Sequence, residues 1–220
     1  MELNLVQVVA IYALPVLFAI TLHEAAHGFV ARRFGDLTAW RLGRVSLNPI
    51  RHVDPVGTLL VPLVLLATSK LLGGGGLLFG WAKPVPVNFG ALRRPKRDML
   101  WVAAAGPLAN LAMALGWAAL FKASAMAPPN YFSVPFGLVA EAGIAVNVVL
   151  MVLNLLPILP LDGGRIAVSL LPERLSRLYA RSEPLGFPIL LVLLITNLLG
   201  AILDPLVRSS MNLIGTLFQL

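Results

Sequence analysis

A short motif rich in ionisable side chains, HEAAH at 23–27, stands at the end of a long apolar run near the N-terminus. On a helix, residues four apart share a face, so His23 and His27 can direct two imidazole nitrogens at one ion. Zinc suits such ligands, and a catalytic zinc usually keeps three protein ligands and one water. Glu24 projects about 100° away from His23, within reach of that water. The motif therefore predicts hydrolysis by a zinc-activated water with Glu24 as general base.

A pair of hydrogen-bonded core histidines with a capping glutamate would also explain this pattern, because short motifs often match by chance. The setting argues against that alternative. Three ionisable groups inside an apolar span are costly, and the default interpretation of such groups is functional. The motif lies close to Arg32 at the end of the run, so snorkelling relieves only part of the cost.

A third protein ligand must come from elsewhere, and the absence of cysteine excludes thiolates. The candidates are His52, in NPIRHVDP, and Asp162, in NLLPILPLDGGR. The prolines before Asp162 end an apolar run, and the two glycines after it permit a sharp path that aims its carboxylate back at neighbouring helices. The alternative use of Asp162 is a turn or a helix N-cap.

The elements that position these residues must be membrane spans. The chain is 58% hydrophobic and 12% charged, whereas soluble domains average about a quarter charged residues. Four apolar runs have roughly the 20 residues needed to cross a bilayer; they cover about 5–31, 99–121, 135–156 and 185–203. We expect one integral-membrane domain over 1–220, an all-α polytopic membrane protein whose first run is a retained span rather than a signal peptide.

A fifth apolar stretch, 55–82, holds Lys70 and four consecutive glycines. The flanking segments 32–54 and 83–98 are both basic, and the positive-inside rule assigns both to the cytoplasm. Two crossings between them would need about 40 residues, more than the stretch contains. We expect a re-entrant apolar hairpin here, and the alternative is one plain span with a basic loop outside.

The same rule places 122–134 outside and the basic loop 172–184 inside. The HEAAH end of the first span and the Asp162 end of the third then meet near the cytoplasmic face of a multi-pass protein in the cell membrane. This shared depth favours Asp162 as the third ligand. His52 lies on the same side, but in a basic loop where solvation or a hydrogen bond is its expected role.

HEAAH at 23–27 together with NLLPILPLDGG at 154–164 resembles the site-2 protease family of intramembrane zinc metallopeptidases. The similarity extends to AGPLANL at 105–111 and to GWAKPVPVN at 80–88, which looks like the compact prokaryotic branch of the family. No insertion long enough for a PDZ domain is expected. The resemblance implies cleavage of transmembrane protein substrates in the lipid bilayer, as in regulated intramembrane proteolysis.

Residue by residue, the resemblance implies one Zn²⁺ held by His23, His27 and Asp162, with Glu24 as catalytic base. It also implies that Asn110 and Asn154 line the site, where they would hydrogen-bond the substrate backbone or the developing oxyanion. The alternative role of both asparagines is to bond neighbouring helices together.

A protease that cuts a membrane helix must first unwind it, and a strand edge could hold the unwound segment by β-augmentation. We expect short membrane-adjacent β-strands in 37–47 and 80–89, where side chains alternate. The Gly-rich stretch 55–82 could gate access to the site.

The main competing function is a transporter or channel in which His, Glu and Asp pass ions or protons. Transporters often show internal repeats and sites near the bilayer midplane, and neither feature is visible here. A non-catalytic membrane scaffold that keeps its zinc is disfavoured by the intact Glu24. A nucleic-acid partner is suggested only by the net charge of +7 and lacks a supporting motif.

Overall fold

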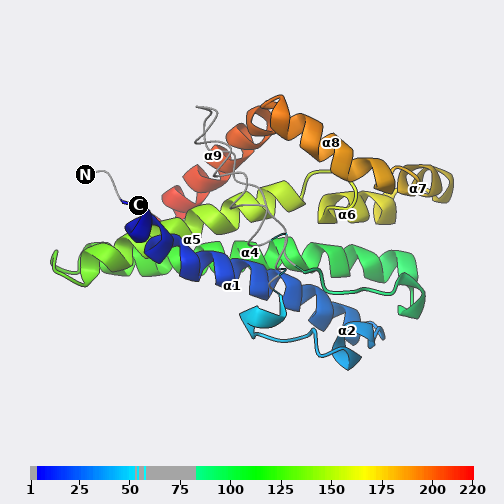
Figure 1. Ribbon diagram of the computed structural model, residues 1–220, viewed down its shortest axis with the longest axis horizontal. Helices are drawn as coiled ribbons and strands as arrows, with labels where there is room; N and C mark the ends of the chain where they lie inside the picture. Colours follow the sequence, from blue (N-terminus) through cyan, green and yellow to red (C-terminus); the bar gives the residue numbers. More distant parts are fainter. Residues whose placement is uncertain (1–3, 53, 55–56, 58–82) are drawn as a thin grey trace.

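Three long apolar helices form the centre of the molecule and lie side by side in Figure 1. The computed structural model describes residues 4–220 apart from 53, 55–56 and 58–82. Each of the three, within that part of the chain, is long and apolar enough to cross a membrane: α1 (Leu5–Arg33), α4 (Pro95–Met126) and α5 (Ser133–Asn154). They correspond to the first three predicted spans.

Local sequence signals define where α1 begins and ends. The Asn4 side chain accepts a hydrogen bond from the Gln7 amide, and the Gln7 side chain accepts one from the Asn4 amide, which forms a capping box. Arg32 and Arg33 occupy the last turn, where positive charges interact favourably with the negative end of the helix dipole. Gly35 follows with φ of 106°, a conformation that favours glycine, and turns the chain away.

The central helices approach closely because small residues face their neighbours. Ala114, Ala118 and Ala140 have no exposed surface, and Gly143 lies against the Trp117 ring, where an added Cβ would come within 2.4 Å of the indole. In lipid no hydrophobic force drives helices together, so they associate through close packing, and small residues let the backbones approach closely. Close packing brings polar side chains of three different helices within hydrogen-bond distance of one another.

The predicted unbroken span over 185–203 is wrong. In its place α8 (Glu183–Ile195) ends before Asn197, whose φ of 57° is left-handed, and α9 (Leu198–Phe218) begins there. Figure 1 shows α8 and α9 meeting at an angle, and α9 packs back against α5 and α4. A helix of the length of α8 is about 20 Å long and falls short of a hydrocarbon core of about 30 Å. The described residues thus contain three candidate spans, or up to four if α8 and the preceding helix, bent by 61°, count as one.

The predicted strands are also wrong for the described residues of 37–47 and 80–89. The first stretch contains α2 (Thr38–Arg41) and turns, and a 3₁₀ helix, η1 (Pro49–Arg51), follows. The second runs without a paired strand through 83–88 and then enters a 3₁₀ helix, η3 (Phe89–Ala91). Its two prolines carry no N–H and cannot complete a ladder. The expected re-entrant hairpin at 55–82 falls almost wholly outside the described residues.

Two short helices, α6 (Asp162–Leu170) and α7 (Glu173–Ala180), follow the third span. The glycines after Asp162 let α6 dock tightly: a Cβ on Gly163 would lie 2.2 Å from Leu155 O, and one on Gly164 would lie 2.5 Å from Leu159 N. The α6 helix also packs against α4. This docking returns the first residue of α6 to the centre of the bundle.

Candidate metal centre

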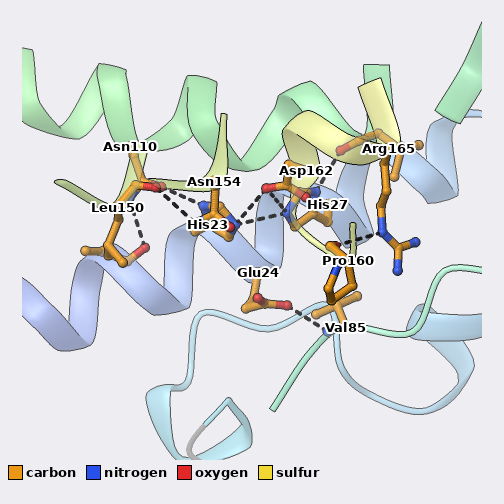
Figure 2. A network of polar contacts seen from close by, with 12 residues as sticks. His23, Glu24, His27, Val85, Asn110, Leu150, Asn154, Pro160, Asp162 and Arg165 are labelled. Carbon is orange, nitrogen blue, oxygen red and sulfur yellow. Dashed lines mark hydrogen bonds and ion pairs between the residues drawn. The ribbon is translucent and has the colours of Figure 1, made fainter. Parts of the chain in front are cut away.

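The side chains of His23, His27 and Asp162 converge between α1 and α6, pointing toward one another in Figure 2. Asp162 Oδ2 lies 3.2 Å from His23 Nε2 and 3.4 Å from His27 Nε2, and the two Nε2 atoms are 3.1 Å apart. All three residues are buried. The spacing of the two histidines and the fold of α6 thus bring together the three residues expected as ligands.

Hydrogen bonds on the far side of each imidazole fix how the rings face the cluster. His23 Nδ1 lies 2.6 Å from Asn110 Oδ1, and His27 Nδ1 lies 2.7 Å from Val102 O. Both partners are acceptors, so each Nδ1 carries the proton and donates it. Each Nε2 is then unprotonated, and its lone pair is directed at Asp162. Outer contacts of this kind usually hold metal-binding histidines in position.

The cluster fits a zinc ion. It consists of two nitrogen lone pairs and a carboxylate oxygen, all acceptors, and Asp162 Oδ2 is buried without a hydrogen-bond partner. A buried acceptor in that state is costly unless a cation binds it. Tetrahedral zinc with bonds of about 2.0–2.1 Å holds its ligand atoms roughly 3.3 Å apart. The observed separations of 3.1, 3.2 and 3.4 Å agree with that value.

Asp162, and not His52, lies with the two histidines. The only group of potential metal ligands found among the described residues contains His23, His27 and Asp162. His52 is completely buried, and its Nε2 lies 2.7 Å from Ser46 O, so a hydrogen bond holds it. The N-cap of α6 is Leu161, so Asp162 does not serve as that cap.

A buried chain of amides connects the three central helices behind His23. The Asn110 NH₂ donates to Asn147 Oδ1 at 2.9 Å, and the Asn147 NH₂ donates to Gly143 O at 2.9 Å. Asn110 and Asn147 have no exposed surface. Asn110 was expected to contact substrate or oxyanion, whereas here both of its polar atoms are engaged within the protein. Asn147 is not among the residues predicted to lie near the site, although an asparagine inside an apolar run is a usable signal.

Asn154, the other asparagine expected near the site, is the last residue of α5. Its NH₂ donates to Leu150 O at 3.0 Å in the preceding turn, and the side chain is half-buried. This bond leaves its carbonyl oxygen and its second amide N–H as the groups that could meet a ligand. Its predicted contact with substrate stays a prediction.

Gly106 in α4 lies directly against the two histidines. A Cβ at this position would lie 2.5 Å from both His27 Nε2 and His23 Cε1. Real Cβ atoms essentially never approach other atoms that closely. Only glycine therefore lets α4 cover the cluster at this distance, a role that the AGPLANL sequence alone did not reveal.

The carboxylate of Glu24 is held by a backbone amide. The Val85 N–H donates to Glu24 Oε2 at 2.7 Å, as Figure 2 shows. Val85 is buried, and its side chain packs over Gly28, where an added Cβ would lie 3.3 Å from Val85 Cγ1. One carboxylate oxygen is thus occupied by the protein, and the other, which has no partner among the described residues, could meet a ligand.

Residues 83–88, which we call the strap, are fastened at both ends as well. The Lys83 N–H donates to His52 O at 2.9 Å, and the Asn88 N–H donates to Asp36 Oδ2 at 2.7 Å. The strap therefore has a fixed register along the last turns of α1. Sequence analysis anticipated an extended segment here but not its bond to Glu24.

Asp36 is the anchor at the far end of the strap. Burial would raise the pKa of this carboxyl, but hydrogen bonds from Thr38 and from the Asn88 backbone outweigh burial and lower the pKa below its ordinary value. The carboxylate is thus ionised at neutral pH and accepts both bonds.

Comparison with known proteins points to one family. The family model of peptidase family M50 matches residues 130–197. The chain is 37% identical over 209 residues to a Bacillus subtilis protein described as "Putative zinc metalloprotease YwhC", and the match covers 94% of this chain and 90% of that protein. It is 36% identical over 189 residues to "Putative zinc metalloprotease Rip2" of Mycolicibacterium smegmatis, covering 84% of this chain and 66% of that protein. No solved structure matches the chain.

These relatives agree with the geometry. Two histidines and an aspartate converge with separations that suit zinc, on a chain with helices apolar enough to cross a membrane. The expected resemblance and the predicted zinc cofactor are confirmed. The chain belongs to peptidase family M50, the site-2 protease family, and is a zinc metalloprotease.

Proposed function

We propose that the enzyme hydrolyses peptide bonds in transmembrane or membrane-proximal segments of other membrane proteins. The observation that carries this proposal is the position of the cluster: both histidines lie inside α1, an apolar helix long enough to span a bilayer. A substrate that reaches buried ligands in such a helix must itself enter the apolar region. Ion or proton passage, the alternative drawn from the sequence, would not require a protease's ligand set.

The chemistry follows from the assigned side chains. His23, His27 and Asp162 would hold zinc, which when bound supplies a water acidified toward a pKa of about 7. Glu24 would take the proton from that water and deliver it to the departing amide nitrogen. The Val85 N–H holds one oxygen of Glu24, so the free oxygen has a defined direction. Fixed orientation of a general base is a recognised source of rate enhancement.

The two asparagines expected at the site receive different roles in this proposal. Asn110 is a positioning residue, because it orients His23 through the Nδ1 hydrogen bond and is itself held by Asn147. Asn154 retains the proposed contact, because the bond to Leu150 uses only one of its two amide hydrogens. The second N–H could donate to the oxyanion, and the side-chain carbonyl oxygen could accept from a substrate backbone N–H.

The strap is the proposed place where an unwound substrate segment would first meet the protein. It passes Glu24 and has an extended backbone at Asn88, with φ of −93° and ψ of 104°. Pro84 and Pro86 have no N–H, so these two residues offer only carbonyl acceptors to a neighbouring chain. A substrate would bind there mainly through its own N–H groups.

The proposed orientation follows the basic loops. The segments at the Arg33 end of α1 and around α7 carry the excess of Lys and Arg, so both belong on the cytoplasmic side of the cell membrane. The metal cluster lies near the same end of α1. Water would then reach it by a short path from the cytoplasm.

The test compares wild type with Glu24→Gln in liposomes that contain a single-span substrate. We expect both proteins to bind zinc equally and only wild type to cleave, because the amide keeps the shape of the side chain but cannot accept the proton. Cleavage by the variant at the wild-type rate would refute the assigned role of Glu24.

A further inference from the structure

A hollow lined by basic side chains lies apart from the metal cluster. It has a volume of about 380 Å³ and is lined by Arg44, Arg51 and Lys83, together with Leu42, Gly43 and Ile50. This volume lies within the range of roughly 300–1,000 Å³ that is typical of small-molecule sites. The three cations come from three separate segments, after α2, at the end of η1 and at the start of the strap. Their meeting is therefore a product of the fold and not of a local run of basic residues.

Backbone carbonyls hold the two guanidinium groups in place. Arg44 Nη1 donates to Arg51 O, and Arg51 Nη1 donates to Gly43 O at 2.5 Å. Gly43 has φ of 64°, and a Cβ there would lie 2.7 Å from Arg51 Nη1, so glycine is needed for this approach. Each guanidinium has five N–H donors and spends only part of them on these carbonyls. The remaining donors have a fixed direction.

The positive charges of the hollow are not balanced by acidic side chains among the described residues. Within the part of the chain that the structure describes, none of Arg44, Arg51 and Lys83 forms an ion pair with an acidic residue. Like charges held together repel one another, and an anion bound between them removes the repulsion. Guanidinium forks match phosphate oxygens in geometry, and an ammonium adds a compact charge. The chemistry of the hollow therefore suits a phosphate group.

Apolar side chains around the hollow identify the source of that phosphate. Leu42 and Ile50, which line the hollow, are 63% and 80% exposed. Trp40 in α2 is also exposed and carries the Arg32 guanidinium 3.5 Å above its ring. Exposed tryptophan and aliphatic residues beside cations are typical of protein surfaces that lie at the membrane–water interface. A soluble phosphate would leave these apolar side chains in water, whereas a lipid would cover them.

We propose that this hollow binds the phosphodiester headgroup of an anionic glycerophospholipid, with Leu42 and Ile50 against its acyl chains. Lys83 is the first residue of the strap, and its backbone amide is bonded to His52 O. A lipid held there would contact the same segment that binds Glu24. The binding itself does not depend on zinc or on proteolysis, so it can be tested independently of the proposed function.

The test uses the full chain in zwitterionic micelles, titrated with phosphatidylglycerol or with phosphatidylcholine, and counts bound lipids by native mass spectrometry. The variant Arg44→Gln/Arg51→Gln/Lys83→Gln removes the three cations. Each Lys or Arg near a lipid surface contributes about 1 kcal/mol, so we expect phosphatidylglycerol to bind on the order of 100-fold more weakly. The control Arg97→Gln/Arg174→Gln/Arg181→Gln makes the same charge change at exposed positions elsewhere and should bind as wild type does.

The single variant Lys83→Gln is a second test that does not depend on whether the triple variant folds. The strap uses the backbone of Lys83 and not its side chain, so this variant keeps the arginine hydrogen bonds and should bind the lipid about five-fold more weakly. Equal affinity of wild type and both hollow variants would overturn the proposal. So would tight binding of inorganic phosphate at the same residues without binding of phosphatidylglycerol, or equal losses in the hollow variant and in the charge-matched control.

Discussion

Replacing Gly106 by alanine tests the metal centre at the point where packing is tightest. The added methyl would lie 2.5 Å from His27 Nε2 and from His23 Cε1, and 2.6 Å from His23 Nε2. Ordinary contact begins at 3.4 Å, so α4 or both imidazoles must move by nearly an ångström. Zinc–ligand distances tolerate only about ±0.2 Å. The Asn110–Asn147 hydrogen bond and the close contact of Gly143 with Trp117 hold α4 against α5. We therefore expect the imidazoles to give way and at least one histidine to leave its bonding position.

The expected loss follows from what one ligand contributes. Structural zinc sites bind with about 10–16 kcal/mol over four ligands, so one ligand is worth roughly 2.5–4 kcal/mol and its loss weakens binding about 70- to 900-fold. The helix itself should tolerate the change, because alanine is favoured over glycine within helices by about 1 kcal/mol.

The assay is a zinc titration of the detergent-solubilised protein against a chelator of known affinity. Gly116→Ala in the same helix is the matched control, because no atom lies within 4 Å of the added Cβ. The control should bind zinc as wild type does and should be at least as stable. Unchanged zinc affinity in Gly106→Ala would refute the packing of α4 against the two histidines.

Three further predictions concern the groups around the cluster. Asn110→Ala removes the acceptor for His23 Nδ1 and should lower zinc affinity about 10- to 100-fold in the same titration; unchanged affinity would contradict its positioning role. Val85→Pro removes the N–H that holds Glu24 and should lower kcat about 10-fold or more with zinc content unchanged, whereas Val85→Ala keeps the N–H and should retain most activity in the cleavage assay. Because the folded pKa of Asp36 lies below its unfolded value, its stabilising effect should be complete above about pH 5 and disappear as the pH falls toward the folded pKa. Thermal unfolding of wild type and Asp36→Asn should therefore converge at low pH, and a constant difference would count against the anchor.

The three residues of the candidate metal site could be predicted from the sequence because their signals are local. A two-histidine motif four residues apart on a helix fixes a shared face, and an aspartate between prolines and glycines indicates a turn back into the bundle. The loop charges then supplied the common depth. None of these steps required knowledge of how the helices rotate about their axes.

The contacts behind the ligands depend on that rotation and could not be predicted. Gly106 and Asn147 lie on helices that are apolar on all sides, so hydropathy does not show which face meets α1. Helix packing, through small residues such as Ala114 and Gly143, decides which polar groups meet.

Two errors in the predicted fold have specific backbone causes. The run 185–203 is apolar on both sides of Asn197, so composition shows no break, yet the left-handed residue ends the helix there. The alternation in the strap suggested a strand, but Pro84 and Pro86 remove the donors that pairing requires. In both places one residue's backbone dihedral angle or two missing N–H donors decide the secondary structure, which the hydropathy and the alternation of the side chains did not show.

The central claim is that Asp162 completes a zinc site with His23 and His27. Its most direct test is the zinc content per chain of wild type, Asp162→Ala and His52→Gln, purified identically and measured by inductively coupled plasma mass spectrometry. We predict one zinc per chain in wild type and in His52→Gln, and its loss in Asp162→Ala. Zinc retained in Asp162→Ala and lost in His52→Gln would contradict the assignment.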